Sequence, residues 1–185
     1  MTSIVQHAPR FSEQDAVRLA HDFFGFEASA GQLPSERDQN FHLTCRTGEQ
    51  YVLKVANATE SIEVLEFQNQ VMMHIARTKD RLTQEIVAAP DICTRMNGGQ
   101  IISVECLDGG AHFARLLTYW PGKAFARVRP LDAYLLTVLG GFLGGIDRIL
   151  AVFYSPAALR DFHWDLIIAG RVVHRTIGLI DEPVK

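Results

Sequence analysis

The stretch QNFHLTCRTGEQYVLKVAN, residues 39–57, decides the fold of this 185-residue chain. Its two arms, residues 39–46 and 51–56, carry the alternation and the β-branched and aromatic side chains that are typical of strands. The residues RTGEQ, 46–50, contain a glycine and have the composition of a turn. The sequence therefore predicts a β-hairpin.

The second arm of the hairpin carries one lysine among apolar neighbours. Successive side chains of a strand point to opposite faces, so Val52, Lys54 and Ala56 share one face. A lysine on an otherwise apolar strand is costly to bury unless it meets an anion. Lys54 is therefore a candidate anion-binding residue. The alternative is a lysine on an edge strand whose ammonium reaches solvent.

Helical patterns flank the hairpin on both sides. Before it, Ser12 is expected to cap a helix that ends at Gly25, with Phe11 and Ala16 at the positions of a hydrophobic staple. After it, Thr59 is expected to cap a helix of about 18 residues with a single apolar stripe. The stripe comprises Val64, Leu65, Val71, Met72, Ile75 and Ala76.

Three further strands and a long apolar helix follow. The strands are expected around Asp91–Arg95, at Gln100–Leu107 and in HFARLLTYW, residues 112–120. Residues Leu131–Tyr154 have the pattern of one helix that is apolar nearly all round, and we expect it to be buried. Adjacent strands joined by tight turns indicate an antiparallel sheet with a helix packed on it. The predicted fold class is therefore α+β.

Composition excludes several classes of function. The apolar fraction of 48% and the charged fraction of 21% are ordinary for a soluble protein with a core. A net charge of −3 argues against a nucleic acid or a membrane surface as partner. The most apolar stretch, Tyr134–Phe153, contains four glycines, Asp147 and Arg148, so a buried helix is favoured over a membrane span.

The cysteines and the first residues point to a cytoplasmic protein. Residues 1–15 contain no apolar run of signal-peptide length. The three cysteines are far apart in the sequence and form no Cys/His cluster with the spacing of a zinc site. We expect Cys45, Cys93 and Cys106 to be buried thiols in a reducing compartment.

Five segments, taken in this order, resemble the aminoglycoside phosphotransferase and hydroxylysine kinase-like family. They are LPSERDQNFHL at 33–43, YVLKVAN at 51–57, EFQNQ at 66–70, RLLTYWPGKAFA at 115–126 and FYSPAALRDFHWDL at 153–166. Each segment is weak alone, but their order and spacing are specific, and together they span nearly the whole chain. The resemblance implies a protein-kinase-like N-terminal lobe over residues 1–118. A hinge and the incomplete start of a helical C-terminal lobe would occupy residues 119–185.

The resemblance implies that the nucleotide is ATP. In the family, the lysine at the position of Lys54 contacts the α- and β-phosphates, and a helix glutamate pairs with that lysine. The segment EFQN aligns Glu66 with this glutamate. Glu63 lies one turn earlier on the same face, and either residue could instead be a solvated helix charge.

The polar loop SERDQNF, residues 35–41, stands where protein kinases have a glycine-rich phosphate loop. It contains neither G-x-G-x-x-G nor a Walker A motif. The resemblance implies that its backbone and side chains cover the phosphates, and the alternative is a plain turn between two strands. The candidate residues of this loop are Ser35, Asp38, Gln39 and Asn40.

The segment LTYWPG, residues 117–122, is expected to be the hinge between the lobes. In the family, the edge of the adenine bonds to backbone groups of the hinge. Thr118, Tyr119 and Trp120 are therefore candidates by position. Tyr119 and Trp120 could also be core aromatics at the end of a strand, which is compatible with this role.

The catalytic loop of the family is not found in the chain. That loop carries a His, an Asp and an Asn about five residues later, and a metal-binding Asp follows it. His21-Asp22 lies on the first helix, His163-Trp164-Asp165 is followed by Gly170 where Asn is required, and Asp181 has no neighbouring His. We therefore assign no catalytic base and no metal ligand, and we expect the chain alone to be inactive. Ligands for Mg²⁺ are expected in a missing lobe.

The function that the resemblance implies is the ATP-binding half of a kinase that phosphorylates a hydroxyl group of a small amino compound. SERDQNF together with LLTYWPG also resembles modules that are fused to class III aminotransferases in some bacteria. The alternative is therefore a pseudokinase-like docking module in such a fusion, although the chain has no pyridoxal-phosphate site. The expected partners are a nucleotide, a small hydroxylated amine and a second copy bound through uncovered C-terminal helices.

Overall fold

The computed structural model describes residues 7–82, 88–106, 109–160 and 165–179. The chain divides into two compact units, Met1–Phe153 and Tyr154–Lys185. The first unit includes the helix at residues 133–150, which follows the predicted hinge, because this helix packs on the helix at residues 62–82. The boundary near residue 118, which separates lobes by their roles, remains a prediction.

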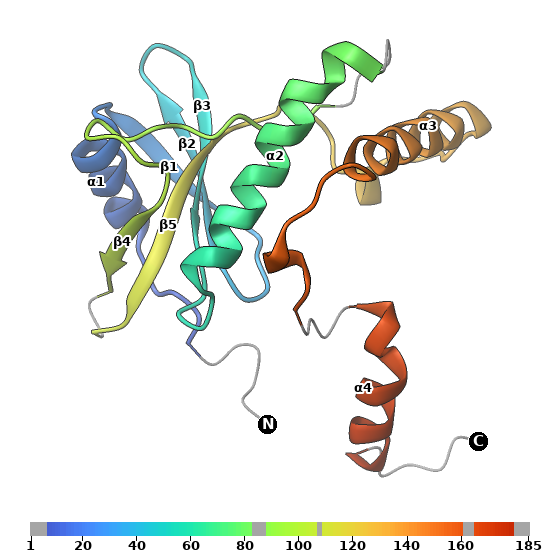
Figure 1. Cartoon of the computed structure of the whole chain (residues 1–185). Helices are drawn as coiled ribbons and strands as arrows, with labels where there is room; N and C mark the ends of the chain where they lie inside the picture. Colours follow the sequence, from blue (N-terminus) through green and yellow to red (C-terminus); the bar gives the residue numbers. More distant parts are fainter. Residues whose placement is uncertain (1–6, 83–87, 107–108, 161–164, 180–185) are drawn as a thin grey trace. The chain divides into compact units, whose positions relative to one another are not determined.

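The first unit is built on a five-stranded antiparallel sheet with the order β1-β2-β3-β5-β4 (Figure 1). The predicted hairpin is confirmed as β2 and β3, in which Phe41 lies opposite Leu53. The strands are β1 (Ala28–Leu33), β2 (Gln39–Cys45), β3 (Gln50–Val55), β4 (Ile102–Glu105) and β5 (Ala111–Thr118).

Helix α1 (Glu13–Phe24) covers one face of the sheet. The predicted ends of this helix are confirmed: Ser12 forms a capping box with Asp15, and Gly25 ends the helix with a left-handed φ of 78°. The core on this face consists of buried side chains from α1, from the segment just before it and from four strands. They include Phe11, Ala16, Ala20, Phe41, Leu43, Leu53, Val55, Ile102, Val104, Ala114 and Leu116.

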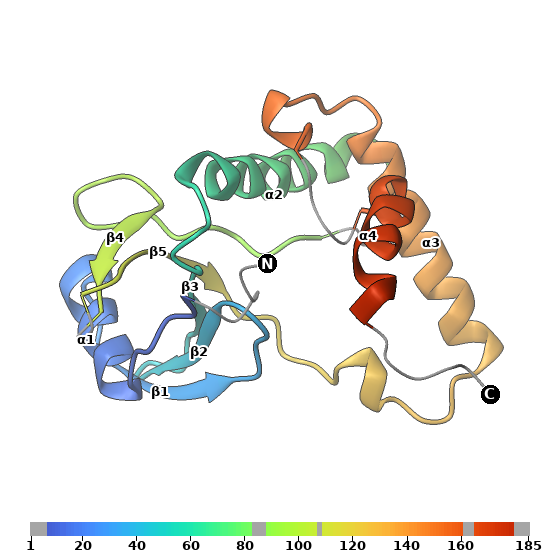
Figure 2. The same cartoon turned by 90° about the horizontal axis from the view of Figure 1, so that it is seen from below.

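Helix α2 (Ile62–Leu82) lies on the opposite face of the sheet (Figure 2). Leu116 belongs to the core under α1, whereas the preceding side chain, Arg115, contacts α2. Because successive side chains of a strand point to opposite faces, the two helices cover opposite faces of β5. The helix begins at Ile62, so Thr59 is not its cap as expected. Instead, Thr59 donates its N–H and its hydroxyl to the side-chain oxygen of Asn57.

The strands beyond α2 differ in one point from the expectation. Residues 91–95 form only an isolated bridge, between Ile92 and Leu117, and not a strand. The reason is that two segments share one edge of β5. Strand β4 occupies residues 111–114 of that edge, so only residues 116–118 are left to accept the segment at Ile92. Strand β1, which the sequence did not predict, pairs with β2 along its whole length.

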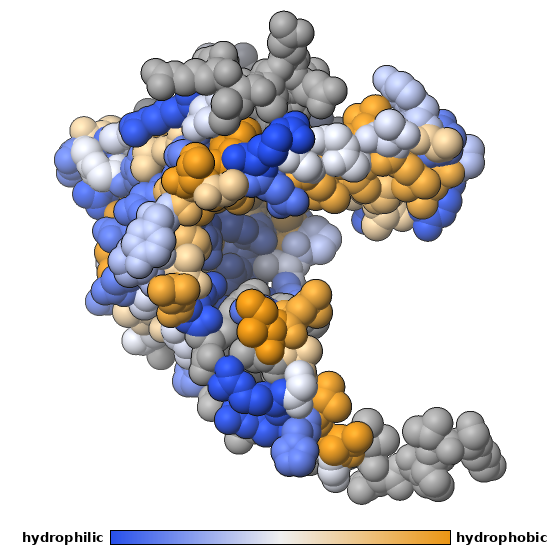
Figure 3. Space-filling view, turned by 45° about the vertical axis from the view of Figure 1, so that its right-hand side comes forward, coloured by the Kyte–Doolittle hydropathy of each residue, from blue (hydrophilic) through white to orange (hydrophobic). Residues whose placement is uncertain are grey.

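Helix α3 (Ala133–Leu150) is largely exposed, so the expectation of a buried helix is wrong. Only its last turns pack on α2, where Ile149 contacts Ile75. One helix can cover only one side of another, and the remaining apolar side chains of α3 form an open surface (Figure 3). Within the described ranges, α3 alone is long and apolar enough to cross a membrane. That is weak evidence, since core helices of soluble proteins meet the same criteria.

The described part of the second unit includes the short helix α4 (Ala169–Thr176). Three-residue turns of 3₁₀ helix precede it at Leu166–Ile168 and follow it at Ile177–Leu179. Asp165 caps the first turn by accepting the N–H of Ile167 at 2.9 Å. Helix α4 falls within residues 119–185, for which a hinge and the start of a helical lobe were expected.

Candidate functional site

Three polar side chains form a row across the middle of the sheet. Asn40 on β2 lies opposite Lys54 on β3, and Lys54 lies opposite Arg115 on β5. Directly opposite residues of an antiparallel pair place their side chains on the same face. Because Arg115 contacts α2, the whole row lies on the α2 face, away from the core under α1.

Lys54 is held by a neutral amide. Its Nζ donates to Oδ1 of Asn40 at 3.0 Å, and no ion pair joins it to a carboxylate in the described parts of the chain. Burial lowers the pKa of Lys54, which the carboxylate of Asp38 opposes and the charge of Arg115 reinforces. Strand β3 lies between β2 and β5, so the alternative of a lysine on an edge strand is wrong.

Arg115 is the most buried charge of the row, with 4% of its surface exposed. Its Nη1 donates to Oδ1 of Asn69 at 2.6 Å and to the carbonyl of Leu65 at 3.3 Å, and its Nη2 donates to Oε1 of Gln68. Its Nε is buried without a hydrogen-bond partner. Burial lowers the pKa of Arg115. The guanidinium thus joins β5 to α2 through uncharged acceptors.

The loop before β2 is tied to the connection between β3 and α2. Oδ1 of Asp38 accepts the N–H of Asn57 at 3.1 Å, and Nδ2 of Asn57 donates to the carbonyl of Arg37 at 3.2 Å. Arg37 in turn forms an ion pair with Glu60 at 3.2 Å. These contacts fix the loop near the polar row, whereas Ser35 is exposed on the same loop.

Gln39 lies on the other face of the sheet from Lys54. It is buried, its Nε2 donates to the carbonyl of Phe11, and its Oε1 accepts the N–H of Phe11, each at 2.8 Å. Alternation along β2 explains this position, because Gln39 precedes Asn40 by one residue. The side chain that we expected over phosphates therefore holds the segment that leads into α1.

Glu66 and Lys54 are not brought together. Glu66 is exposed and lines a hollow of about 430 Å³ that also includes Gln70 and Gln100. On a helix of 3.6 residues per turn, Leu65 and Asn69 share a face, and here that face meets the sheet. Glu66 is turned away from it. Glu63 is exposed as well, and a hydrogen bond with Ser61 lowers its pKa.

The predicted hinge uses part of its backbone within the protein. The N–H of Thr118 donates to the carbonyl of Asp91 at 2.9 Å, and the N–H of Tyr119 donates to the carbonyl of Gln50 at 3.0 Å. The Tyr119 ring lies 4.2 Å from the His42 ring on the α2 face. Trp120 is 51% exposed, so it is not a core aromatic, and its N–H has no partner among the described residues.

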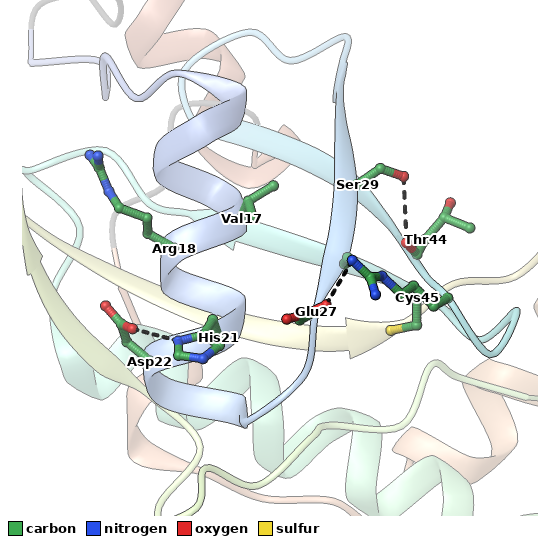
Figure 4. Close-up of a pocket in the computed structure, with 10 residues that line it drawn as sticks. Val17, Arg18, His21, Asp22, Glu27, Ser29, Thr44 and Cys45 are labelled. Atoms are coloured by element: carbon green, nitrogen blue, oxygen red, sulfur yellow. Dashed lines mark hydrogen bonds and ion pairs between the residues drawn. The ribbon is translucent and has the colours of Figure 1, made fainter.

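A second hollow lies away from the polar row. It has a volume of about 710 Å³ and is enclosed by α1, β1 and the end of β2 (Figure 4). Two pairs line it: His21 with Asp22 at 2.9 Å, and Glu27 with Arg46 at 3.1 Å. This position separates His21-Asp22 from Lys54, and its rejection as a catalytic motif stays a prediction.

The other rejected motifs can be placed only in part. His163, Trp164 and Asp181 lie outside the described residues. The carboxylate of Asp165 already caps a turn. The described ranges contain no group of three or more His, Cys, Asp or Glu side chains that could hold a metal ion. The expectation that the magnesium ligands lie elsewhere stays a prediction.

Sequence reasoning missed the residues that surround the lysine. Arg115, Asn69 and Gln68 were not singled out, although a signal was present. Arg115 is one cation in the apolar segment HFARLLT, which is the argument that identified Lys54 in YVLKVA. The amides lie in the segment EFQNQ, two and three residues after the glutamate that was chosen.

Comparison with known proteins gives relatives of one chemical class. No protein-family model matches the chain. Hydroxylysine kinase from Mus musculus is 30% identical over 176 residues, which is 85% of this chain and 44% of that protein. Hydroxylysine kinase from Danio rerio is 29% identical over 161 residues, covering 83% of this chain and 43% of that protein. The chain thus spans less than half the length of these relatives.

Solved structures with the same fold are also kinases. The amicoumacin kinase in complex with AMP-PNP, Ca²⁺ and Ami has a TM-score of 0.67 at 14% identity, over 95% of this chain and 55% of that chain. A microcompartment-associated aminopropanol kinase has a TM-score of 0.59 at 15% identity, over 83% and 45% of the two chains. These likenesses confirm the predicted α+β, kinase-like fold.

Proposed function

Because the chain belongs to the aminoglycoside phosphotransferase-like kinases, we propose that it is the ATP-binding part of a small-molecule kinase. Phosphoryl transfer from ATP depends on charge neutralisation and alignment of the phosphates more than on covalent help from the protein. The part of the enzyme that binds the nucleotide must therefore present fixed positive charge next to a site for the base.

The observation that carries this proposal is the pairing of Lys54 with Arg115 on the α2 face of the sheet. Two cations lie side by side on central strands, and neither forms an ion pair with a carboxylate in the described ranges. Burying like charges together is unfavourable unless an anion binds between or beside them. A polyphosphate chain is an anion of the required charge and length.

The remaining roles follow from the position of each group. Lys54 would contact the phosphates, and the loop that carries Ser35, Asp38 and Asn40 would lie over them. His42 follows Asn40 by two residues on the same face of β2, and its ring contacts Tyr119 of the hinge. The hinge therefore lies further along the sheet than the polar row. There the N–H of Trp120 and the carbonyls of Thr118 and Tyr119 would bond the adenine edge, since the other two N–H groups are already used.

The divalent ion and the acceptor belong to the whole protein in this proposal. The amicoumacin kinase structure contains AMP-PNP and Ca²⁺, which supports a nucleotide with a divalent ion, and we propose Mg²⁺ here. The names of two relatives, hydroxylysine kinase and aminopropanol kinase, denote substrates with both an amino and a hydroxyl group. We propose a small hydroxylated amine as the phosphate acceptor, and the cytoplasm as the compartment.

The proposal is tested by calorimetric titration of the chain with ATP. Lys54→Met is expected to weaken ATP binding about tenfold, which corresponds to the loss of one charge-assisted contact. Lys123→Met is the matched control, because Lys123 is exposed in the segment after the hinge. An unsubstituted chain that does not bind ATP, or equal affinity for both variants, would overturn the proposal. Failure of the whole protein to bind ATP and Mg²⁺ would favour the docking module instead.

A further inference from the structure

Both cations of the row are oriented by uncharged groups. Asn40 accepts from Lys54, while Asn69 and Gln68 accept from Arg115. The carboxylate of Asp38 acts on the pKa of both cations, and that of Glu60 acts on the pKa of Arg115. Asp38 already accepts an N–H of the backbone, and Glu60 forms an ion pair with Arg37. The positive charge of the row is therefore fixed in direction without being neutralised by an ion pair in the part of the chain that the structure describes.

Arg115 is a costly residue to keep at this position. Arg115 is buried, with 4% of the residue's surface exposed, so its guanidinium loses most of its hydration, and a facing carboxylate is the usual compensation. Here one of its nitrogen atoms, Nε, has no hydrogen-bond partner among the residues that the structure describes. The residue at the facing position of α2 is Asn69, an amide that has the shape of an aspartate but not its charge. Unlike an ordinary ion pair, this contact does not neutralise the positive charge of Arg115.

We propose that Arg115 is a positioning residue that orients α2 through Asn69 and Gln68 and whose charge acts with that of Lys54 on a bound polyphosphate. This inference rests on the proposed nucleotide site and extends it. Arg115 does not touch the ligand, since it is buried beneath α2. It raises the affinity for phosphate through the electrostatic potential at Lys54, and the amides of α2 are needed because a carboxylate would cancel that potential.

A purely structural role for Arg115 predicts a different response to one substitution. Asn69→Asp keeps the acceptor oxygen and makes the contact with Arg115 charge-assisted. This gain offsets the loss of the long hydrogen bond of 3.4 Å that Nδ2 of Asn69 donates to Oε1 of Gln100, so helix docking is preserved or strengthened. If Arg115 only docks α2, this variant binds nucleotide normally. If its charge serves the phosphates, the same variant loses affinity for ATP while its thermal stability does not fall.

The experiment compares Asn69→Asp with Gln70→Glu, which adds the same charge on the exposed side of α2. ATP is titrated calorimetrically, adenosine binding is followed by ligand-observed NMR, and Tm is measured without ligand. We expect Asn69→Asp to weaken ATP binding about tenfold, with adenosine binding unchanged and Tm not lowered, and Gln70→Glu to stay within about twofold. Normal ATP binding by Asn69→Asp, or equal losses for ATP and adenosine with a lower Tm, would overturn the inference.

A second pair of variants tests the inference even if Asn69→Asp does not fold. Arg115→Lys keeps the charge, whereas Arg115→Met keeps only part of the shape. The inference requires that ATP affinity be better in the lysine variant than in the methionine variant by about fivefold or more. Equal losses in both would overturn it. The Lys54→Met measurement is independent: if that variant binds ATP normally, the nucleotide site itself is misplaced, whatever the Arg115 variants do.

Discussion

Lys54 of β3 and Arg115 of β5 are direct cross-strand partners, and their cationic side chains share the face of the sheet that carries α2. Like charges directly opposite each other destabilise a sheet, and burial adds to that cost. The pair is therefore expected to reduce the stability of the folded chain in exchange for its binding role.

The first prediction concerns stability and pH. Burial lowers the pKa of Lys54 in the folded state, so Lys54→Met should raise the free energy of unfolding by about 1 kcal/mol at pH 7. As pH rises through the folded pKa, the folded state loses the proton before the unfolded state does, so the burial cost of Lys54 falls. The advantage of the variant should narrow towards pH 10. Urea unfolding at both pH values measures this, with Lys123→Met as the control.

The second prediction separates Gln39 from the site. Gln39→Ala removes both partners of the Phe11 backbone and should cost about 2–3 kcal/mol of unfolding free energy, because a buried N–H and a buried carbonyl lose their hydrogen bonds. Affinity for ATP should change less than twofold at temperatures where the variant is folded. Gln32→Ala, at an exposed position of β1, is the control and should change neither quantity. A Gln39→Ala variant that is stable but binds ATP weakly would mean that Gln39 contributes to phosphate binding, as the sequence predicted.

The parts of the fold that the sequence predicted correctly depend on local chemistry. Ser12 and Gly25 bound α1 as expected, since capping and a left-handed C-terminal residue are properties of a few adjacent residues. The β2–β3 hairpin likewise depends on residues that are close together in the sequence. Strand β1 was missed because its sequence, ASAGQL, has small side chains and little strand preference. Pairing with β2 along its whole length makes it a strand, and a sequence pattern does not show that pairing.

The candidate site was predicted only in part, because some of its contacts depend on local sequence and others on tertiary packing. Alternation in a strand placed Lys54 on a defined face, and the structure puts Asn40 beside it. The partner on α2 depends on how that helix is rotated about its axis, which tertiary packing sets. A rotation that directs Asn69 to Arg115 directs Glu66 to the surface, so the family alignment and the geometry point to different residues. The apolar pattern of α3 indicated burial but not what would cover it.

The third prediction tests the alignment against this geometry. Glu66→Gln should change the affinity for ATP less than about twofold, because Glu66 is exposed and forms no ion pair with Lys54 in the part of the chain that is described. Glu63→Gln is the matched control on the same helix. A tenfold loss confined to Glu66→Gln would mean that α2 turns when nucleotide binds and brings Glu66 to the lysine.

The fourth prediction concerns the thiols, all three of which are free. Burial raises the pKa of Cys93 to about 11, and it raises that of Cys45 as well. At pH 8 only about 0.1% of a thiol with that pKa is thiolate, so Cys93 should react with Ellman's reagent on the order of 100-fold more slowly than free cysteine. All three thiols should react promptly in urea. Cys93→Ser identifies the contribution of Cys93, and fast reaction of one native thiol that this variant abolishes would contradict the prediction.

The fifth prediction concerns the exposed face of α3. Leu136 and Leu143 lie two turns apart on the same side of the helix and are 49% and 52% exposed. Apolar surface of this extent favours association, and we expect a second copy of the chain to cover it. Sedimentation velocity at increasing concentration should show a dimer or larger species. The double variant Leu136→Glu with Leu143→Glu should sediment as a monomer, because burying two carboxylates in an apolar contact is unfavourable. Gln32→Glu with Gln70→Glu adds the same charge at exposed positions outside α3 and should leave association unchanged. The prediction would be contradicted if the unsubstituted chain were a monomer at every concentration. It would also be contradicted if both double variants were monomeric to the same extent.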